Sequence, residues 1–280
     1  MIGRMATAIR RNSVVAYFAF VYLAAALAFV AFAGPGLSRD GSVRPADLLP
    51  AFPLMVVGVA LAGAALTAVV DGRRGLRELR GRLGRWRVGA RWYAAVLVPP
   101  ALILVALVGL SRFLSPAFAP NLFVLGLLFG VVAGFFEEIG WMGCAYPRLR
   151  AGRGAFGAGV LLGVLWGAWH LPVVDSLGAA SPHGAAWPPF FLAFLLLVTA
   201  LRVLIVWAYE HTGSLPLCQL VHASSTGSLV VLSPVGVTPG EEALWYGVYA
   251  GLLWLVVGVL HVWRGWPSRS TAAEPARSAL

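Results

Sequence analysis

The sequence predicts an all-α membrane protein, a polytopic bundle of about eight transmembrane helices. Hydrophobic residues make up 60% of the 280 residues, charged residues make up only 11%, and the mean hydropathy is +0.83. Such a composition cannot cover a soluble surface, so the chain must use lipid as its solvent. Because the segments between apolar runs are short, we expect one membrane domain over 1–280.

Eight apolar runs account for the predicted spans, since each helical crossing needs about 20 apolar residues. They cover residues 14–33, 50–70, 94–110, 122–138, 156–171, 188–209, 215–232 and 243–262. The first run follows three arginines, as in a signal peptide, but it is longer than the usual hydrophobic region of about 7–15 residues. We interpret it as a retained first span, and we expect the tail 266–280 to be disordered.

The distribution of arginine predicts the orientation, because cytoplasmic loops are enriched in basic residues. The N-terminus, segment 71–92, segment 146–155 and the residues after the last run carry three, eight, three and three arginines, and the loops on the opposite side carry three in total. We therefore expect a multi-pass cell-membrane protein with both termini in the cytoplasm. The net charge of +10 suits contact with anionic lipids, and without a base-reading motif it does not indicate nucleic acid.

Segment 71–92 is predicted to be a basic amphipathic loop on the cytoplasmic side. Its apolar residues have the spacing of an interfacial helix: Leu76, Leu79, Leu83 and Trp86. A helix on the lipid surface is the simpler interpretation, and a docking platform for an acidic partner is the alternative.

Ionisable residues inside the spans are the most informative positions, because a charge in the hydrocarbon region is costly and usually faces a partner or a cavity. The spans of the segment 122–232 contain Glu137, Glu138, His170, Arg202 and His222. Burying each of them alone would be expensive. We therefore expect Glu137, His170 and His222 to converge within about one water-bridged hydrogen bond.

Three segments carry these residues: "GFFEEIGWMGC", "LWGAWHLP" and "GSLPLCQLVHASST". They resemble the CAAX prenyl protease and bacteriocin self-immunity family of intramembrane metalloproteases. Glu137 and Glu138 match its Glu-Glu pair, Trp166 and His170 match an aromatic-x-x-x-His motif that usually has Phe, and His222 matches the last histidine. The resemblance covers residues 126–226, within a core of 122–232, and implies an intramembrane endopeptidase.

Two positions depart from the family pattern. Met142 stands where the family has arginine, and Thr226 stands where it often has asparagine. An arginine at 142 would lie one helical turn beyond Glu138 and hold that carboxylate ionised. Without it we expect Glu138 to be neutral unless Arg202 or Arg148 approaches it, and Met142→Arg to leave activity unchanged or higher. Arg202 is otherwise expected to brace the site.

The residue types also suit peptide hydrolysis without reference to the family. That reaction needs an activated water, a proton carrier and donors for the oxyanion. Glu137 is the candidate general base, His170 and His222 are the groups that hold the water, and Glu138 completes the catalytic set, with Trp166, Thr226 and Arg202 in support. One Glu and two His also form an acceptable zinc site with an open position. The sequence therefore leaves two alternatives, a water bound to zinc and a water held without a metal.

The predicted function is endopeptidase cleavage of a membrane-associated peptide or protein, with membrane lipids as further partners. Met142 and Thr226 leave a second possibility, a catalytically silent relative that acts as a membrane scaffold or immunity protein. A small-molecule transporter is less favoured because the halves show no inverted repeat.

Glycines at every fourth position, 126–134 and 159–167, predict close packing of the helices that carry Glu138 and His170.

Overall fold

A computed structural model describes residues 9–33, 50–176 and 184–266, and every regular element in these ranges is helical. Seven helical stretches are long and apolar enough to span a membrane. The remaining predicted run, 156–171, forms the shorter apolar helix α8. The structure thus confirms an all-α polytopic bundle, while the predicted tail 266–280 lies, except for Trp266, outside the described residues.

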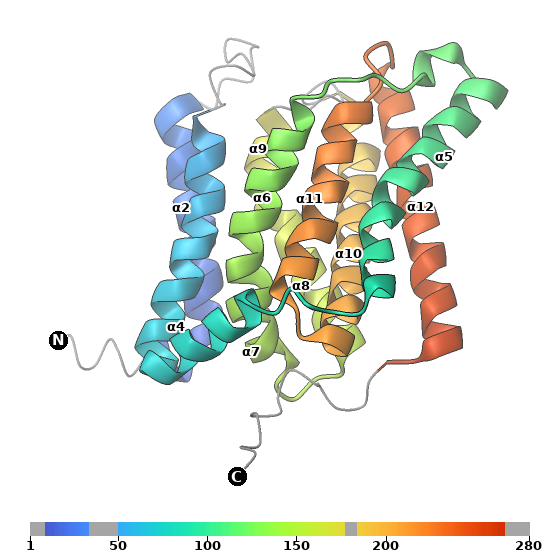
Figure 1. Ribbon diagram of the computed structural model, residues 1–280. Helices are drawn as coiled ribbons and strands as arrows, with labels where there is room; N and C mark the ends of the chain where they lie inside the picture. The colour runs from blue at the N-terminus through green and yellow to red at the C-terminus, as the bar shows by residue number, and fades with distance from the viewer. Residues whose placement is uncertain (1–8, 34–49, 177–183, 267–280) are drawn as a thin grey trace.

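The bundle is arranged around α6 and α11, which lie side by side in its centre (Figure 1). Helices α2 and α4 pair on one side, α8 and α10 pack together behind, and α5 and α12 border the opposite side. The elements are α2 (Ser13–Ala33), α4 (Ala51–Leu83), η1 (Ala90–Leu97), α5 (Val98–Phe113), η2 (Pro116–Phe118), α6 (Gly126–Gly140), η3 (Trp141–Ala145), α7 (Tyr146–Arg150), α8 (Ala155–Trp169), α9 (Leu171–Ser176), α10 (Trp187–Thr212), α11 (Leu215–Leu232) and α12 (Pro239–Arg264).

Glycine allows α6 and α11 to approach closely. A Cβ atom added at Gly134 would lie 2.5 Å from the carbonyl oxygen of Gln219 and 2.6 Å from the backbone nitrogen of Ala223. The side chain of Gln219 also donates to the carbonyl oxygen of Phe135 at 2.8 Å. The α6 glycine series is therefore a packing surface, and it brings the helix of the Glu pair against the helix of His222.

The basic segment after the second span is helical only in part. Helix α4 turns at Gly72, whose φ of 62° and ψ of −153° suit glycine, and its last part runs crosswise at the lower end of the bundle (Figure 1). Leu79 is buried there, whereas Trp86 lies beyond the helix end and is exposed. The segment is thus helical up to Leu83, and its position at the lipid surface stays a prediction, but Trp86 does not continue the apolar face of this helix.

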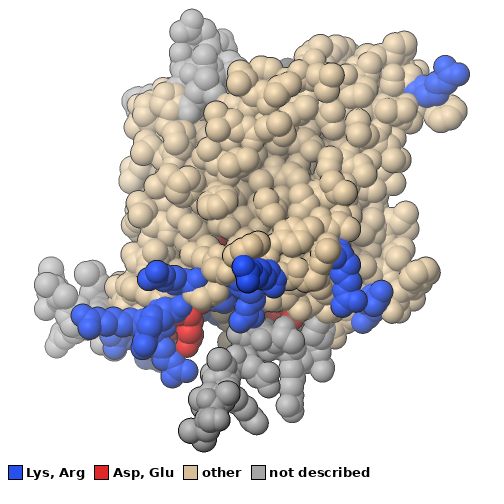
Figure 2. Space-filling model, in the orientation of Figure 1, with Lys and Arg blue, Asp and Glu red and all other residues tan. Residues whose placement is uncertain are grey.

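Basic side chains gather in a band near the lower end of the face seen in Figure 2. In the crosswise part of α4, Arg82 donates from Nη1 to the hydroxyl of Tyr209 at 3.1 Å and from Nη2 to the carbonyl oxygen of Gly143 at 3.0 Å. This part of the helix is therefore attached to the end of the bundle.

Reporter fusions within segment 71–92 and after Gly265 are both expected to report a cytoplasmic location, because cytoplasmic loops are enriched in arginine. A fluorescent reporter that folds only in the cytoplasm and an enzyme reporter active only outside it give opposite readings. A fusion at the exposed helix end near Arg112, on the side poor in arginine, serves as the control and should give the reverse pattern. An extracytoplasmic signal from segment 71–92 would contradict this orientation.

Candidate active site

Glu138 is the centre of a buried ionic network that joins three helices. Its Oε2 accepts from Nη1 of Arg202 on α10 at 2.7 Å, and its Oε1 accepts from Nδ1 of His222 on α11 at 2.7 Å. Glu138 and Arg202 are fully buried. A buried carboxylate between two donors is stabilised as the charged form when its partners are held this close.

Arg202 supplies the cation that Met142 lacks. Met142 is buried, and Arg148 donates to the carbonyl oxygen of Cys144 and pairs with Asp71, away from Glu138. Of the two arginines considered from the sequence, Arg202 is therefore the one that approaches Glu138. The sequence predicted a neutral Glu138 unless one of these arginines approached it, and Arg202 does. The premise that Met142→Arg restores a missing pair therefore fails.

Glu137 is held by two indole rings. The Nε1 atoms of Trp141 and Trp166 both donate to Oε2 of Glu137, each at 2.9 Å. No described side chain donates to the other oxygen, Oε1. The carboxylate is thus fixed in orientation while one of its oxygens stays available.

Trp166 connects the remaining site residues. Its carbonyl oxygen accepts from Nδ1 of His170 at 2.8 Å, and its ring centre lies 4.3 Å from the guanidinium carbon of Arg202. Its ring centroid lies 4.8 Å from that of His222 and 5.3 Å from that of His170. The predicted residues Glu137, His170 and His222 therefore surround one tryptophan, from α6, the end of α8 and α11.

The hydrogen bonds determine the tautomers of both histidines. A carbonyl oxygen can only accept, so Nδ1 of His170 carries the hydrogen. Nδ1 of His222 donates in the same way to the carboxylate of Glu138. In the neutral form of each imidazole, Nε2 is then the acceptor, the arrangement of a histidine that receives a proton or binds a metal.

Thr226 lies one turn after His222 on α11, but it makes no hydrogen bond to any described residue of this network.

Two tryptophans of the site were not predicted. Trp141 lies four residues after Glu137, a helical i,i+4 spacing that the sequence does show. Trp169 contacts the ring of His170 with centroids 4.9 Å apart, but its apolar surroundings do not distinguish it from a lipid-facing tryptophan.

A π-helical turn follows the Glu pair directly. Residues Trp141–Ala145 form this turn, and all five are buried. A π turn adds a residue to the helical repeat and is frequent at functional sites. Here it lies between Glu138 and Tyr146, and Trp141 at its start donates to Glu137.

The described residues contain no group of three or more His, Cys, Asp or Glu side chains arranged to hold a metal ion. In the zinc set considered from the sequence, Oε2 of Glu137 is already occupied by two indole donors. Zinc held by Glu137, His170 and His222 stays a prediction from the sequence, and no catalytic step is assigned to a metal.

The comparison with known proteins agrees with this geometry. The family model described as type II CAAX prenyl endopeptidase Rce1-like matches residues 118–228, which include every residue of the network. Residues 118–228 are therefore similar to the CAAX prenyl protease family. A curated relative, CAAX prenyl protease 2 of Methanococcus maripaludis, is 29% identical over 144 residues, which are 45% of this chain and 51% of the relative. The chain thus matches about half the length of that relative, and the match confirms the resemblance seen over 126–226.

The match bears on the departure at position 142. The matched segment includes the Glu pair and both histidines, and it includes Arg202 as well as Met142. In this chain, the cation beside the second glutamate comes from α10, 64 residues along the chain. The charge of the motif is retained although its position has changed.

Proposed function

We propose that this protein is a CAAX protease-like intramembrane endopeptidase, in which Glu137 activates water to hydrolyse a membrane-associated peptide. The observation that carries the proposal is the arrangement of Glu137, His170 and His222 around Trp166, with Glu137 and His222 buried. Three polar groups from three helices are costly to bury in lipid, and such groups usually mark functional sites.

Glu137 is the proposed general base, acting through Oε1. The two indole donors fix Oε2, so the free oxygen is held ready to accept a proton from water. The water oxygen then bonds to the peptide carbonyl carbon, and the proton passes from Glu137 to the leaving nitrogen as the C–N bond breaks. Pre-orientation of this kind lowers the barrier because the base needs no rearrangement during the reaction.

The two histidines are proposed to hold the water through Nε2, which can accept a hydrogen bond from it. Glu138 and Arg202 act through His222. Glu138 accepts from Nδ1 of His222, the nitrogen opposite Nε2, and Arg202 donates to Glu138. We regard both as positioning residues. A zinc-held water remains a prediction from the sequence, and the roles proposed for Glu137 and the histidines rest on protein groups alone.

Glu137→Gln is expected to reduce peptide release by about 10²–10⁴-fold, the usual contribution of a general base. Glutamine keeps an oxygen that accepts from both indoles, so the folded bundle should persist. The measurement compares peptides released by membranes that contain each variant, identified by mass spectrometry. Glu78→Gln is the matched control, because Glu78 is exposed on α4 and pairs only with Arg74.

Equal peptide release by the wild-type protein and Glu137→Gln, at equal membrane abundance, would contradict the proposal. That result would favour the silent scaffold or immunity protein. The argument for a silent relative is already weaker, because Glu138 has its cation despite Met142.

A further inference from the structure

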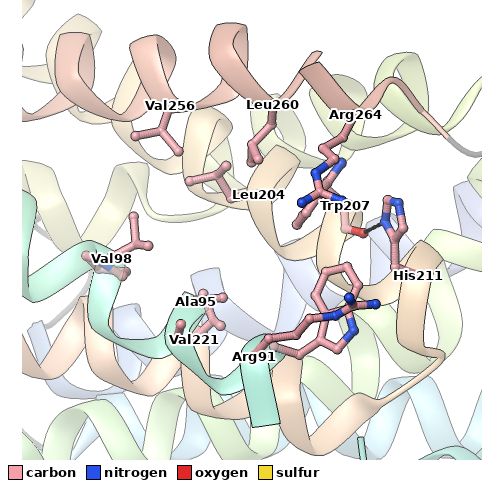
Figure 3. Close-up of a pocket in the computed structure, with 13 residues that line it drawn as sticks. Arg91, Ala95, Val98, Leu204, Trp207, His211, Val221, Val256, Leu260 and Arg264 are labelled. Atoms are coloured by element: carbon pink, nitrogen blue, oxygen red, sulfur yellow. Dashed lines mark hydrogen bonds between the residues drawn. The ribbon is translucent and has the colours of Figure 1, made fainter. Parts of the chain in front are cut away.

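A cavity lies outside the proposed active site. It has a volume of about 410 Å³ and is enclosed by η1, the start of α5, α10, α11 and the end of α12 (Figure 3). Its lining includes none of the residues of the Glu137 and Glu138 network. Its size is that of a site for one small ligand or one chain of a lipid.

The cavity is polar at one end and apolar at the other. Arg91, Arg264 and His211 lie toward one end in Figure 3, whereas Val98 and Val256 lie toward the other. Leu204, Val221 and Leu260 complete much of the apolar wall. A ligand that fits this cavity therefore has a charged or polar head and a hydrocarbon tail.

The charged end is positive and lacks a protein counter-ion. No described carboxylate pairs with Arg91 or Arg264, and the guanidinium of Arg91 lies 5.8 Å from the ring centroid of Trp92. His211 uses Nδ1 to donate to the carbonyl oxygen of Trp207 at 2.7 Å. Two unpaired arginines at the mouth of an apolar cavity are complementary to an anion attached to a hydrocarbon chain.

The surroundings favour a ligand that comes from the membrane. The helices that form the cavity expose apolar side chains next to it, with Leu97 67% exposed on η1 and Val262 79% exposed on α12. In a membrane these side chains contact lipid. Basic pockets between transmembrane helices at the membrane surface are suited to anionic lipid heads.

We propose that this cavity binds one anionic phospholipid, with an acyl chain along the apolar wall and the phosphate between Arg91 and Arg264. Each guanidinium can donate two parallel hydrogen bonds to phosphate oxygens, and the apolar wall separates the acyl chain from the surrounding lipids. The lipid would connect η1 with α12 from inside the bundle. This proposal is independent of peptide cleavage.

The test uses the full chain purified in detergent and incubated with phosphatidylglycerol or phosphatidylcholine that carry the same acyl chains. Native mass spectrometry then measures the fraction of protein that retains each lipid. We expect selective retention of phosphatidylglycerol. The double variant Arg91→Gln/Arg264→Gln should bind it about 25-fold more weakly, since each surface arginine contributes about fivefold toward an anionic lipid.

Matched variants distinguish binding of the lipid in the cavity from non-specific attraction of anionic lipid to the basic surface. Arg77→Gln/Arg80→Gln removes the same charge from exposed positions of α4 and should leave retention unchanged. Val256→Trp fills the cavity and should abolish retention, while Val262→Trp on the exposed face of α12 should not. Unchanged thermal unfolding of each variant shows that the bundle is intact.

Several results would overturn the proposal. Equal retention of the two lipids, or equal loss in the α4 control, would show that no selective site exists. Displacement of the lipid by inorganic phosphate alone would assign the arginines to a free anion. Displacement by an isoprenylated peptide, with no effect of Arg91→Gln/Arg264→Gln, would assign the cavity to a substrate chain.

Discussion

Replacing Arg202 with methionine is expected to destabilise the bundle by about 3–5 kcal/mol, the cost of removing one partner from a buried ion pair. Arg202 and Glu138 are fully buried and 2.7 Å apart, so the variant leaves a carboxylate with only His222 as a donor. Unfolding of the purified protein in detergent, followed by circular dichroism against denaturant, measures the loss. Arg87→Met, at an exposed position next to Trp86, removes the same charge from the surface and should have little effect.

Substitutions at Met142 test whether an arginine at this position can replace Arg202 as the cation beside Glu138. Met142→Arg alone adds a second arginine to a buried position where Glu138 is already paired, so we expect lower stability and lower membrane accumulation. The double variant Arg202→Met/Met142→Arg places one cation a helical turn from Glu138 and should recover part of the loss. Wild-type stability of Arg202→Met by itself would show that the pair does not support the bundle.

Gly134→Leu is expected to cost about 3 kcal/mol, the upper end for overpacking a well-packed interior. The new side chain would begin at a Cβ position 2.5 Å from a carbonyl oxygen and 2.6 Å from a backbone nitrogen of α11. Backbone atoms cannot rotate away, so α6 and α11 must separate, and the contact between Glu138 and His222 must lengthen with them. The same unfolding measurement, together with peptide release, follows both effects.

Gly251→Leu is the matched control for this substitution. Gly251 lies on α12, where an added Cβ would meet nothing within 4 Å. Both variants gain the same helix-forming side chain, so any difference between them comes from packing. If Gly134→Leu and Gly251→Leu unfold alike, the close approach of α6 and α11 does not contribute to stability.

Hydropathy predicted the bundle well because it is a local property of each segment. The run at 215–232 has the same bounds as α11, and the run at 14–33 differs from α2 by one residue. Boundaries were missed where helical structure continues beyond the apolar run. Segment 146–155 was expected to be a loop, yet the chain stays helical through Arg150, because helix formation does not require apolar residues once a helix has begun.

The sequence selected the residues of the candidate site more fully than it predicted the contacts between them. Glu137, Glu138, His170 and His222 were selected because buried ionisable groups are rare in spans. The choice of Arg202 over Arg148 as the partner of Glu138 depends on which helices pack together, and no spacing within α6 determines that. The hydrogen bond from Trp166 to Glu137 was missed for the same reason, since α6 and α8 are separate in the sequence.

The origin of the cation on α10 has a consequence for biosynthesis. An arginine at position 142 would enter the membrane in the same segment as Glu138, whereas Arg202 follows 64 residues later. At a translation rate of about 5–20 residues per second, that separation lasts roughly 3–13 s. During this interval the ribosome has delivered a carboxyl group without its counter-charge, and α6 must wait at the translocon or in the bilayer until α10 arrives.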